Sequence, residues 1–283
     1  MLIAQITDLH IRPVGMLAYG CSNTSQFLAD AVDELLALPT KPDVLFITGD
    51  LADCGLPEEY DLVRKSLQPI KIPIYVIPGN HDRRENMRSA FADHPYLNLS
   101  DSELMNFVID DYPVVLIGLD TVVAGQNHGI MDAPRLDWLA VQLEKYKDKP
   151  VMIFMHHPPF STGIFYMDQI NCLGGDEMAE IVAKFPNVER VVAGHHHRAV
   201  YRSWAGTIGA VTPSVAHQVM FGLEKTPRGR EVMKMEPPAF SLHQWSAETG
   251  VISHQIQIGE FDGPFEFTIH PDYPGYNETP VSE

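Results

Sequence analysis

Short apolar runs recur along the first two hundred residues, separated by stretches with helical spacing. Residues 2–6, 44–47, 74–77, 151–154 and 188–193 are mostly apolar and four to six residues long, which is typical of buried strands. Strands that alternate with helices favour parallel pairing, because each crossover returns the chain to the same edge of the sheet. The pattern therefore predicts an α/β fold with a largely parallel sheet.

The segments between these runs predict helices. Ser25 is suited to cap a helix whose apolar positions recur every three or four residues, and residues 57–67 predict a second helix. Pro134 is well placed at the start of a third helix, and residues 176–184 predict a fourth. Each helix is amphipathic, so we expect the helices to cover the faces of the sheet.

Strand succession without a helix occurs once before residue 200. Residues 107–109 and 114–117 are apolar and are joined by a polar, proline-containing turn, which predicts an antiparallel hairpin in a mixed sheet. Beyond residue 200 the apolar runs are short, and we expect strands at 201–204, 207–211, 240–244 and 251–258. Residues 224–238 are polar and are interpreted as a flap or an oligomer contact. We expect the tail from Phe261 onward to be extended and partly disordered.

Polar patches follow five of the predicted strands. Because the carboxyl ends of parallel strands share one edge of a sheet, these patches are expected to lie together. The central patch is the hexapeptide Ile77 to Asp82, in which Pro-Gly turns the chain sharply and presents Asn80 and His81. The other four patches are Asp8-Leu9-His10, Gly49-Asp50, His156-His157 and Gly194-His195-His196-His197.

Length and charge limit the classes of protein. A chain of 283 residues with 45% hydrophobic residues can bury the core of one large α/β domain, alone or with a small appendage. The net charge of −17 argues against nucleic acid polymers and anionic membranes as partners. A small phosphate substrate would need local positive charge, which bound metal ions can supply.

Cysteine usage and hydropathy indicate a cellular location. Cys21, Cys54 and Cys172 are too few and too scattered for a disulfide framework, so reduced thiols are expected. No signal peptide and no apolar run of about 20 residues is visible. We therefore expect a cytoplasmic protein.

The donor atoms in the five patches indicate a two-metal site. Oxygen and imidazole donors without thiolate suit Fe, Mn, Co or Zn. Seven side chains exceed the ligand set of one ion, whereas two ions about 3.5–4 Å apart that share a carboxylate would use them all. Taken alone, Asp8-Leu9-His10 fits a simple strand-end turn equally well; five patches in order make coincidence improbable. Asp50 is the expected shared ligand, and the full set is Asp8, His10, Asp50, Asn80, His156, His195 and His197.

In order and approximate spacing, these motifs resemble the signature of calcineurin-like metallophosphoesterases. Within that family the chain is similar to the class III cyclic-nucleotide phosphodiesterases and the bacterial glycerophosphodiesterases. The stretches Cys54 to Tyr60, Met155 to Pro159 and His217-Gln218 resemble the glycerophosphodiesterases in particular. The resemblance covers residues 1–220 and fades beyond them.

The resemblance implies a four-layer sandwich of two mixed sheets flanked by helices. It implies a catalytic domain at 1–220, followed by a C-terminal cap and oligomerisation segment with a tail at 221–283. A homo-oligomer, a dimer or larger, is therefore expected.

The resemblance also implies the ligand sets of two divalent transition-metal ions. The first ion would be bound by Asp8, His10, Asp50 and His197, and the second by Asp50, Asn80, His156 and His195. Asn80 is neutral, so the second ion should bind more weakly. The implied mechanism is hydrolysis by a metal-bound hydroxide that attacks phosphorus.

Four further residues are assigned to substrate or catalysis. His81 is expected to hydrogen-bond the phosphate or protonate the leaving group, and Asp53 is the candidate for orienting His81. Asn80 is also expected to contact substrate. His217 and Tyr19 are candidate substrate-binding residues, with ordinary polar loop residues as the alternative. We expect His196 to face away from the metals and His157 to support or pack against a ligand.

The function expected from these residues is metal-dependent hydrolysis of small organic phosphodiesters, such as glycerophosphodiesters or 3′,5′-cyclic nucleotides. A phosphomonoesterase is the first alternative. Protein phosphatases of the family carry an arginine where Cys54 stands, which weakens that assignment. A catalytically silent interaction module is the third alternative, but such modules lose metal ligands and this chain retains all seven.

Overall fold

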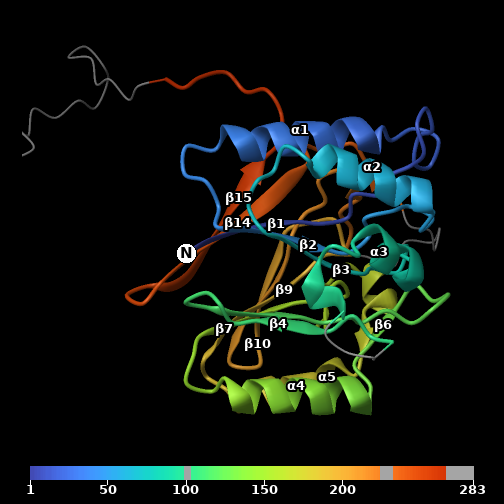
Figure 1. The fold of residues 1–283 in the computed structure, drawn as a ribbon. Helices are drawn as coiled ribbons and strands as arrows, with labels where there is room; N and C mark the ends of the chain where they lie inside the picture. The colour runs from blue at the N-terminus through green and yellow to red at the C-terminus, as the bar shows by residue number, and fades with distance from the viewer. Residues whose placement is uncertain (99–102, 224–231, 266–283) are drawn as a thin grey trace, which may run out of the picture.

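Two β-sheets face each other and helices cover their outer sides, giving four layers (Figure 1). The computed structural model describes residues 1–98, 103–223 and 232–265. Within these ranges, no helix combines the length and apolar character needed to cross a bilayer.

The first sheet has five strands in the order β15-β14-β1-β2-β3. Strands β1, β2 and β3 are parallel, whereas β14 runs antiparallel to both β1 and β15. The strands are β1 (Leu2–Ile6), β2 (Val44–Thr48), β3 (Ile74–Ile77), β14 (Ala239–Ser246) and β15 (Gly250–Gln257).

The second sheet has six strands in the order β10-β11-β9-β7-β5-β4. Its four central strands are parallel, and β4 and β10 pair antiparallel at its two edges. The strands are β4 (Phe107–Ile109), β5 (Val115–Gly118), β7 (Val151–Phe154), β9 (Val188–Ala193), β10 (Val200–Trp204) and β11 (Thr207–Val211).

Helices cover both sheets. The first two α-helices pack on the outer face of the first sheet, and α4 and α5 pack on the outer face of the second (Figure 1). The helices are α1 (Thr24–Ala37), α2 (Pro57–Leu67), α3 (Arg84–Ala90), α4 (Ala133–Lys145) and α5 (Gly175–Val182), with 3-10 turns η1 (Pro95–Asn98) and η2 (Met167–Ile170). Four two-residue strands complete the elements: β6 (Gly129–Ile130), β8 (Cys172–Leu173), β12 (Gln218–Val219) and β13 (Met233–Lys234).

Side-chain alternation along the strands explains why two apolar cores form. In β7, Met152 and Phe154 join the core between the sheets, while Val151 and Ile153 join the core under α4 and α5. Phe154 stacks on Phe46 of β2 with ring centroids 3.9 Å apart, which fixes the two sheets face to face. A strand buried on both faces reads as a continuous apolar run, and this is the pattern seen in the sequence.

The structure confirms most of the predicted elements and changes some details. The 107–109 hairpin is antiparallel as predicted, and all three cysteines, which lie in the described ranges, are unpaired. The prediction that Ser25 caps α1 is wrong. Asn23 is the cap, because its side-chain oxygen accepts a hydrogen bond from the Gln26 N–H and the helix begins at Thr24.

The C-terminal region contributes to the first sheet. Strand β14 pairs with β1 over four residue pairs, so residues 239–257 extend the sheet that carries the N-terminus. The division into 1–220 and 221–283 and the C-terminal cap stay predictions. The expectations for the 224–238 interval and for the tail fall largely on residues 224–231 and 266–283, which lie outside the described residues.

Candidate metal centre

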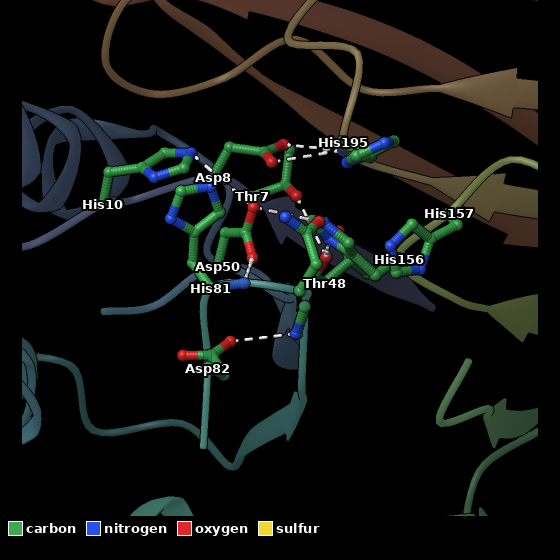
Figure 2. A network of polar contacts seen from close by, with 12 residues as sticks. Thr7, Asp8, His10, Thr48, Asp50, His81, Asp82, His156, His157 and His195 are labelled. Carbon is green, nitrogen blue, oxygen red and sulfur yellow. Dashed lines mark hydrogen bonds and ion pairs between the residues drawn. The ribbon is translucent and has the colours of Figure 1, made fainter. Parts of the chain in front are cut away.

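The seven predicted ligands meet where strands of both sheets end. Three come from the loops after β1 and β2, one from the turn after β3, and three from the loops after β7 and β9. Figure 2 shows side chains from both sheets pointing toward one another across this edge. The side chains are Asp8, His10, Asp50, Asn80, His156, His195 and His197.

The backbone at these loops is strained. Five of the seven residues have positive φ angles between 46° and 68°, a conformation that costs a non-glycine residue energy. Such residues persist only where the surrounding structure enforces them, and they concentrate at functional sites. The five residues are Asp8, His10, Asp50, His195 and His197.

Two glycines allow the strand ends to approach closely. A Cβ atom on Gly79 would lie 2.2 Å from Asp50 Oδ1, and one on Gly194 would lie 2.0 Å from Thr7 Oγ1. Neither position tolerates a side chain, which explains why glycine precedes Asn80 and His195.

The first group of donors surrounds one point between the sheets. His10 Nε2 lies 3.1 Å from His197 Nε2 and 3.7 Å from Asp50 Oδ2. His197 Nε2 in turn lies 3.4 Å from Asp8 Oδ1. Two carboxylates and two imidazoles therefore converge from three loops: Asp8 and His10 follow β1, Asp50 follows β2 and His197 follows β9.

The second group shares Asp50 with the first. His156 Nε2 lies 3.2 Å from Asp50 Oδ2 and 3.2 Å from Asn80 Oδ1. The His195 ring lies 5.1 Å from the His156 ring, centroid to centroid. A single oxygen of Asp50 thus belongs to both groups, as expected for a bridging ligand.

In each ligand histidine, one ring nitrogen points away from the other donors and makes a hydrogen bond; we call it the outward nitrogen. This bond determines whether the second, inward nitrogen carries a proton or a lone pair. His156 Nδ1 donates to the Thr48 carbonyl at 2.8 Å, and His197 Nδ1 donates to the His217 carbonyl at 2.8 Å. A carbonyl oxygen only accepts, so each of these rings carries its proton on the outward nitrogen.

The remaining two histidines follow the same rule. His195 Nε2 donates to the Ile170 carbonyl at 3.0 Å, and His10 Nδ1 lies 3.2 Å from the Asp53 carboxylate. The facing Nε2 atoms of His10 and His197 therefore each present a lone pair, and no proton lies between them. Electron-rich atoms packed in this way fit divalent cations, and these outward bonds are the ones that orient histidine ligands in metal sites.

Burial and mutual charge shift the acid–base properties of the protein alone. Burial raises the pKa of Asp8 to about 7. Asp50 is equally buried, but the charges of His156 and His81 outweigh the burial and hold its pKa well below the usual range. Burial opposes protonation of His156, but the charge of Asp50 raises its pKa to about 9. Asp50 is thus the carboxylate that stays ionised at neutral pH.

Burial keeps the other ligand histidines neutral. Desolvation lowers the pKa of His197 to about 4 and holds the pKa values of His10 and His195 well below the ordinary range. Neutral imidazole is the form that binds a metal ion.

His81 lies beside Asp53 and contacts its backbone more closely than its carboxylate. Its Nδ1 donates to the backbone carbonyl of Asp53 at 2.7 Å, whereas the Asp53 carboxylate is 3.8 Å away and lies closer to His10. Burial opposes a charge on His81, but Asp50 and the bond to the Asp53 carbonyl raise its pKa. The ring is anchored at Nδ1, which leaves Nε2 available.

An open cavity of ≈ 200 Å³ leads to the two groups of donors. Tyr19 and His217 both line it, and their rings meet edge to face with centroids 5.3 Å apart. His217 Nδ1 has no hydrogen-bond partner among the described residues. The cavity also contains residues that the sequence pattern did not single out: Asn127, Ile170, Val219 and Met233.

Asp82 is a structural residue that motif reasoning missed. Its buried carboxylate accepts hydrogen bonds from the backbone N–H groups of Leu51, Ala52 and Gly79 and from the Tyr60 hydroxyl. It thereby ties the loop after β2 to the turn after β3. The available signal was its position in the Asn80-His81-Asp82 sequence, which places a carboxylate next to the tight turn.

The neighbouring histidines support loops. His157 Nδ1 lies 2.8 Å from Thr121 Oγ1, and His196 Nδ1 lies 3.0 Å from Thr162 Oγ1. Both rings are fully buried, so neither has a solvent role.

Comparison with known families gives a match over most of the chain. A family model described as calcineurin-like phosphoesterase matches residues 1–199. A protein of Arcobacter nitrofigilis named as a probable glycerophosphodiester phosphodiesterase is 37% identical over 98% of both chains. A glycerophosphodiester phosphodiesterase of Enterobacter lignolyticus is 33% identical over 97% of both chains.

Other relatives carry a different substrate in their names. A 3′,5′-cyclic-nucleotide phosphodiesterase of Nostoc is 30% identical over 96% of this chain and 97% of its own. Among solved structures, a dimetal phosphatase of Danio rerio superposes with a TM-score of 0.66 at 14% identity, covering 92% of this chain and 99% of that one. At that identity the superposition supports the four-layer fold alone, and the fold predicted from the sequence is confirmed.

Proposed function

Because the chain belongs to the calcineurin-like phosphoesterase family, we propose that it hydrolyses small organic phosphodiesters at a two-metal centre. The relatives that match it from end to end are phosphodiesterases by name. Glycerophosphodiesters are the favoured substrates, because the two relatives named for them share the highest identities cited above.

The observation that carries the proposal is the convergence of imidazole and oxygen donors around Asp50. Four imidazoles have their outward nitrogens bonded, and their inward nitrogens converge with two carboxylates and the Asn80 oxygen. We assign the first metal to Asp8, His10, Asp50 and His197, and the second to Asp50, Asn80, His156 and His195. Fe, Mn, Co and Zn all suit these donors.

The side chains would divide the remaining work. Divalent cations bound here would neutralise phosphate charge and lower the pKa of water. His81, held at Nδ1 by the Asp53 carbonyl, would donate a proton from Nε2 to the leaving alkoxide. Tyr19, His217 and the amide of Asn80 would position the diester, since they line the same cavity.

Two expectations about the protein as a whole accompany this function. A homo-oligomer and a cytoplasmic location both stay predictions from the sequence. The net charge of −17 makes an uncharged or cationic alcohol group on the substrate more compatible with the protein than a polyanion.

A substrate panel tests the function. Metal-free protein is reconstituted with Mn²⁺, Co²⁺, Zn²⁺ or Fe²⁺ and assayed with bis(p-nitrophenyl) phosphate, p-nitrophenyl phosphate, cyclic AMP and glycerophosphoethanolamine. We expect metal-restored hydrolysis of the diesters, with kcat/KM for glycerophosphoethanolamine above that for cyclic AMP.

The other outcomes identify the alternatives. Faster hydrolysis of p-nitrophenyl phosphate than of every diester would make the protein a phosphomonoesterase. Absence of both bound transition metal and metal-restored activity would make it an interaction module of the same fold.

A further inference from the structure

One carboxylate outside the proposed ligand sets holds together the loop that supports His195. Asp168 lies in the loop formed by residues 161–171, which carries η2 and follows β7. Its Oδ1 accepts hydrogen bonds from Thr162 N at 2.7 Å, Thr162 Oγ1 at 2.8 Å and Asn171 Nδ2 at 3.1 Å. Its Oδ2 accepts from Ser161 Oγ at 2.5 Å and Gly163 N at 2.9 Å.

These five bonds join the two ends of the loop. Residues 161–163 begin it and Asn171 ends it, so the Asp168 side chain closes a ring of backbone and side-chain donors. Burial opposes the charge of Asp168, but the hydrogen bonds from Ser161 and Thr162 lower its pKa. An ionised carboxylate fits this position, because its oxygens only accept and three of the five partner atoms, Thr162 N, Gly163 N and Asn171 Nδ2, only donate.

The loop touches the metal centre through one atom in particular. The Ile170 carbonyl, two residues after Asp168, accepts the hydrogen bond from His195 Nε2. That bond places the proton of His195 on Nε2 and leaves Nδ1 as the nitrogen that can bind a metal ion. Thr162, which is hydrogen-bonded to Asp168, also contacts His196, the residue that follows His195.

Besides the bonds of Asp168, the two ends of this loop are tied to neighbouring segments: the Asn171 carbonyl accepts from the Gly129 N–H at 3.2 Å, and the Ser161 carbonyl accepts from Arg202 at 3.0 Å. Its apolar residues Ile164 and Met167 pack with Val219 in a small cluster separate from the two main cores. The support of His195 differs in this respect from that of His156, whose outward nitrogen bonds to Thr48 at the end of a central strand. The hydrogen bonds of Asp168 link η2, which ends at Ile170, to residues 161–163 and so help to position the Ile170 carbonyl.

We propose that Asp168 is a positioning residue for the second metal: it holds the Ile170 carbonyl where that carbonyl fixes the tautomer and orientation of His195. This inference rests on the proposed two-metal site. The proposal predicts different effects on the two ions, because His195 belongs to the second ligand set only. His10 and His197, which belong to the first set, are supported by Asp53 and the His217 carbonyl instead.

The test is metal binding by Asp168→Asn. The amide keeps the shape of the side chain but turns one acceptor into a donor facing other donors. Calorimetric titration of the metal-free protein with Mn²⁺ should show the second binding step weakened by roughly 10- to 100-fold, the usual effect of losing support behind a ligand, with the first step unchanged. Hydrogen exchange of residues 161–171 should speed up in the same variant without metal.

Asp43→Asn is the matched control. The Asp43 carboxylate also accepts a backbone hydrogen bond, from Leu2 N at 2.7 Å, but it precedes β2 and so lies at the opposite end of the strand from Asp50. Both binding steps should stay as in the wild type. If Asp168→Asn does not fold, Thr162→Val and Ser161→Ala each remove a donor to Asp168, and each should weaken the second step by a smaller factor.

Three outcomes would overturn the proposal: two unchanged binding steps in Asp168→Asn, equal weakening of both steps, or wild-type exchange rates in the loop. A wild-type protein that binds only one ion, or none, would instead contradict the two-metal function on which the proposal rests.

Discussion

Asp50 joins the two groups of donors through a single oxygen atom, and a histidine of each group lies close to that atom. The Asp50 Oδ2 atom lies 3.2 Å from His156 and 3.7 Å from His10, while Oδ1 accepts a hydrogen bond from the His81 N–H at 2.9 Å. Both oxygens are therefore committed: Oδ2 faces the proposed cation positions and Oδ1 binds the turn after β3. No other proposed ligand belongs to both sets.

This geometry predicts different consequences for two neighbouring substitutions. Asp50→Ala should abolish hydrolysis and deplete both metals, because each ion loses an anionic ligand. His81→Ala should retain both metals and slow turnover by about 10²-fold or more, the usual contribution of a general acid. Metal analysis of the purified variants and kcat measurement check the pair; equal metal loss in both would refute the division of roles.

The charge of the second ligand set gives another prediction. Asn80 supplies a neutral oxygen 3.2 Å from His156 Nε2, so Asn80→Asp adds a negative charge at the second ion. We expect that ion to bind about tenfold more tightly or better, since ligand charge tunes the affinity of oxygen sites. Competition with a calibrated chelator measures the change, and unchanged affinity would show that Asn80 is not a ligand.

For single residues, the sequence allows the side-chain ligands to be predicted but not the backbone carbonyls that accept their hydrogen bonds. The seven donors could be predicted because each follows an apolar strand, and a strand end fixes where a side chain goes. The carbonyls of Thr48, His217 and Ile170, which set the histidine tautomers, could not be predicted, because every residue has a carbonyl. Asp168 was missed for a related reason: its partners are mainly backbone and hydroxyl groups of a loop without periodicity.

Among the elements, those with strong periodicity were predicted to the residue, while weakly patterned ones were not. Residues 2–6, 57–67, 74–77 and 188–193 form elements with the predicted bounds. The two-residue strands such as β6 carry too few side chains for any alternation to appear. The pairing of β14 with β1, more than 200 residues apart, could not be predicted either, because pairing over that distance leaves no local pattern in the sequence.

A buried polar chain links elements of both sheets. The Arg190 guanidinium of β9 donates to Ser253 Oγ of β15, which lies 2.6 Å from His243 Nδ1 of β14. His243 Nε2 lies 3.0 Å from Gln5 Oε1 of β1, and Gln5 Nε2 donates to Thr48 Oγ1 of β2. His243 is neutral at neutral pH, because burial and the charge of Arg190 lower its pKa to about 3.

The low pKa of His243 predicts an acid-dependent loss of stability. The unfolded chain takes up this proton near pH 6.5, whereas the folded protein does not until about pH 3, so the contribution is complete above pH 6.5 and falls as pH drops toward 3. The loss at pH 5.5 is about 1.4 kcal/mol. His243→Gln should remove this slope.

The measurement is the free energy of unfolding, or the Tm, of metal-loaded wild type and variant at pH 7.5 and 5.5. The metal site is common to both, so its own pH dependence cancels in the difference. His254→Gln, at an exposed position of β15, should leave the wild-type slope intact. Parallel slopes for wild type and His243→Gln would mean that folding does not lower the pKa of His243.

For the molecule as a whole, the metal centre is the place where the two sheets would be joined by coordination. Asp8, Asp50 and Asn80 follow strands of the first sheet, and His156 and His195 follow strands of the second. Without cations, the contacts across this edge include the facing Nε2 lone pairs of His10 and His197, 3.1 Å apart. Bound ions would turn that repulsion into attraction between layers.

Metal binding should therefore stabilise the entire fold. At a free Mn²⁺ concentration about 100 times Kd, one site adds about 2.7 kcal/mol, and each kcal/mol raises the Tm by roughly 2–4 °C in a protein approaching this size. Calorimetric scans with metal and with chelator should differ by roughly 5–10 °C for the wild type and by little for Asp50→Ala. Asp93→Asn, which removes an exposed ion pair with Arg64, should keep the full difference. A Tm shift that persists in Asp50→Ala would place the stabilising ion elsewhere. Amide hydrogen exchange with and without metal is a second readout: if metal slows the exchange in one sheet only, the ions do not join the two sheets.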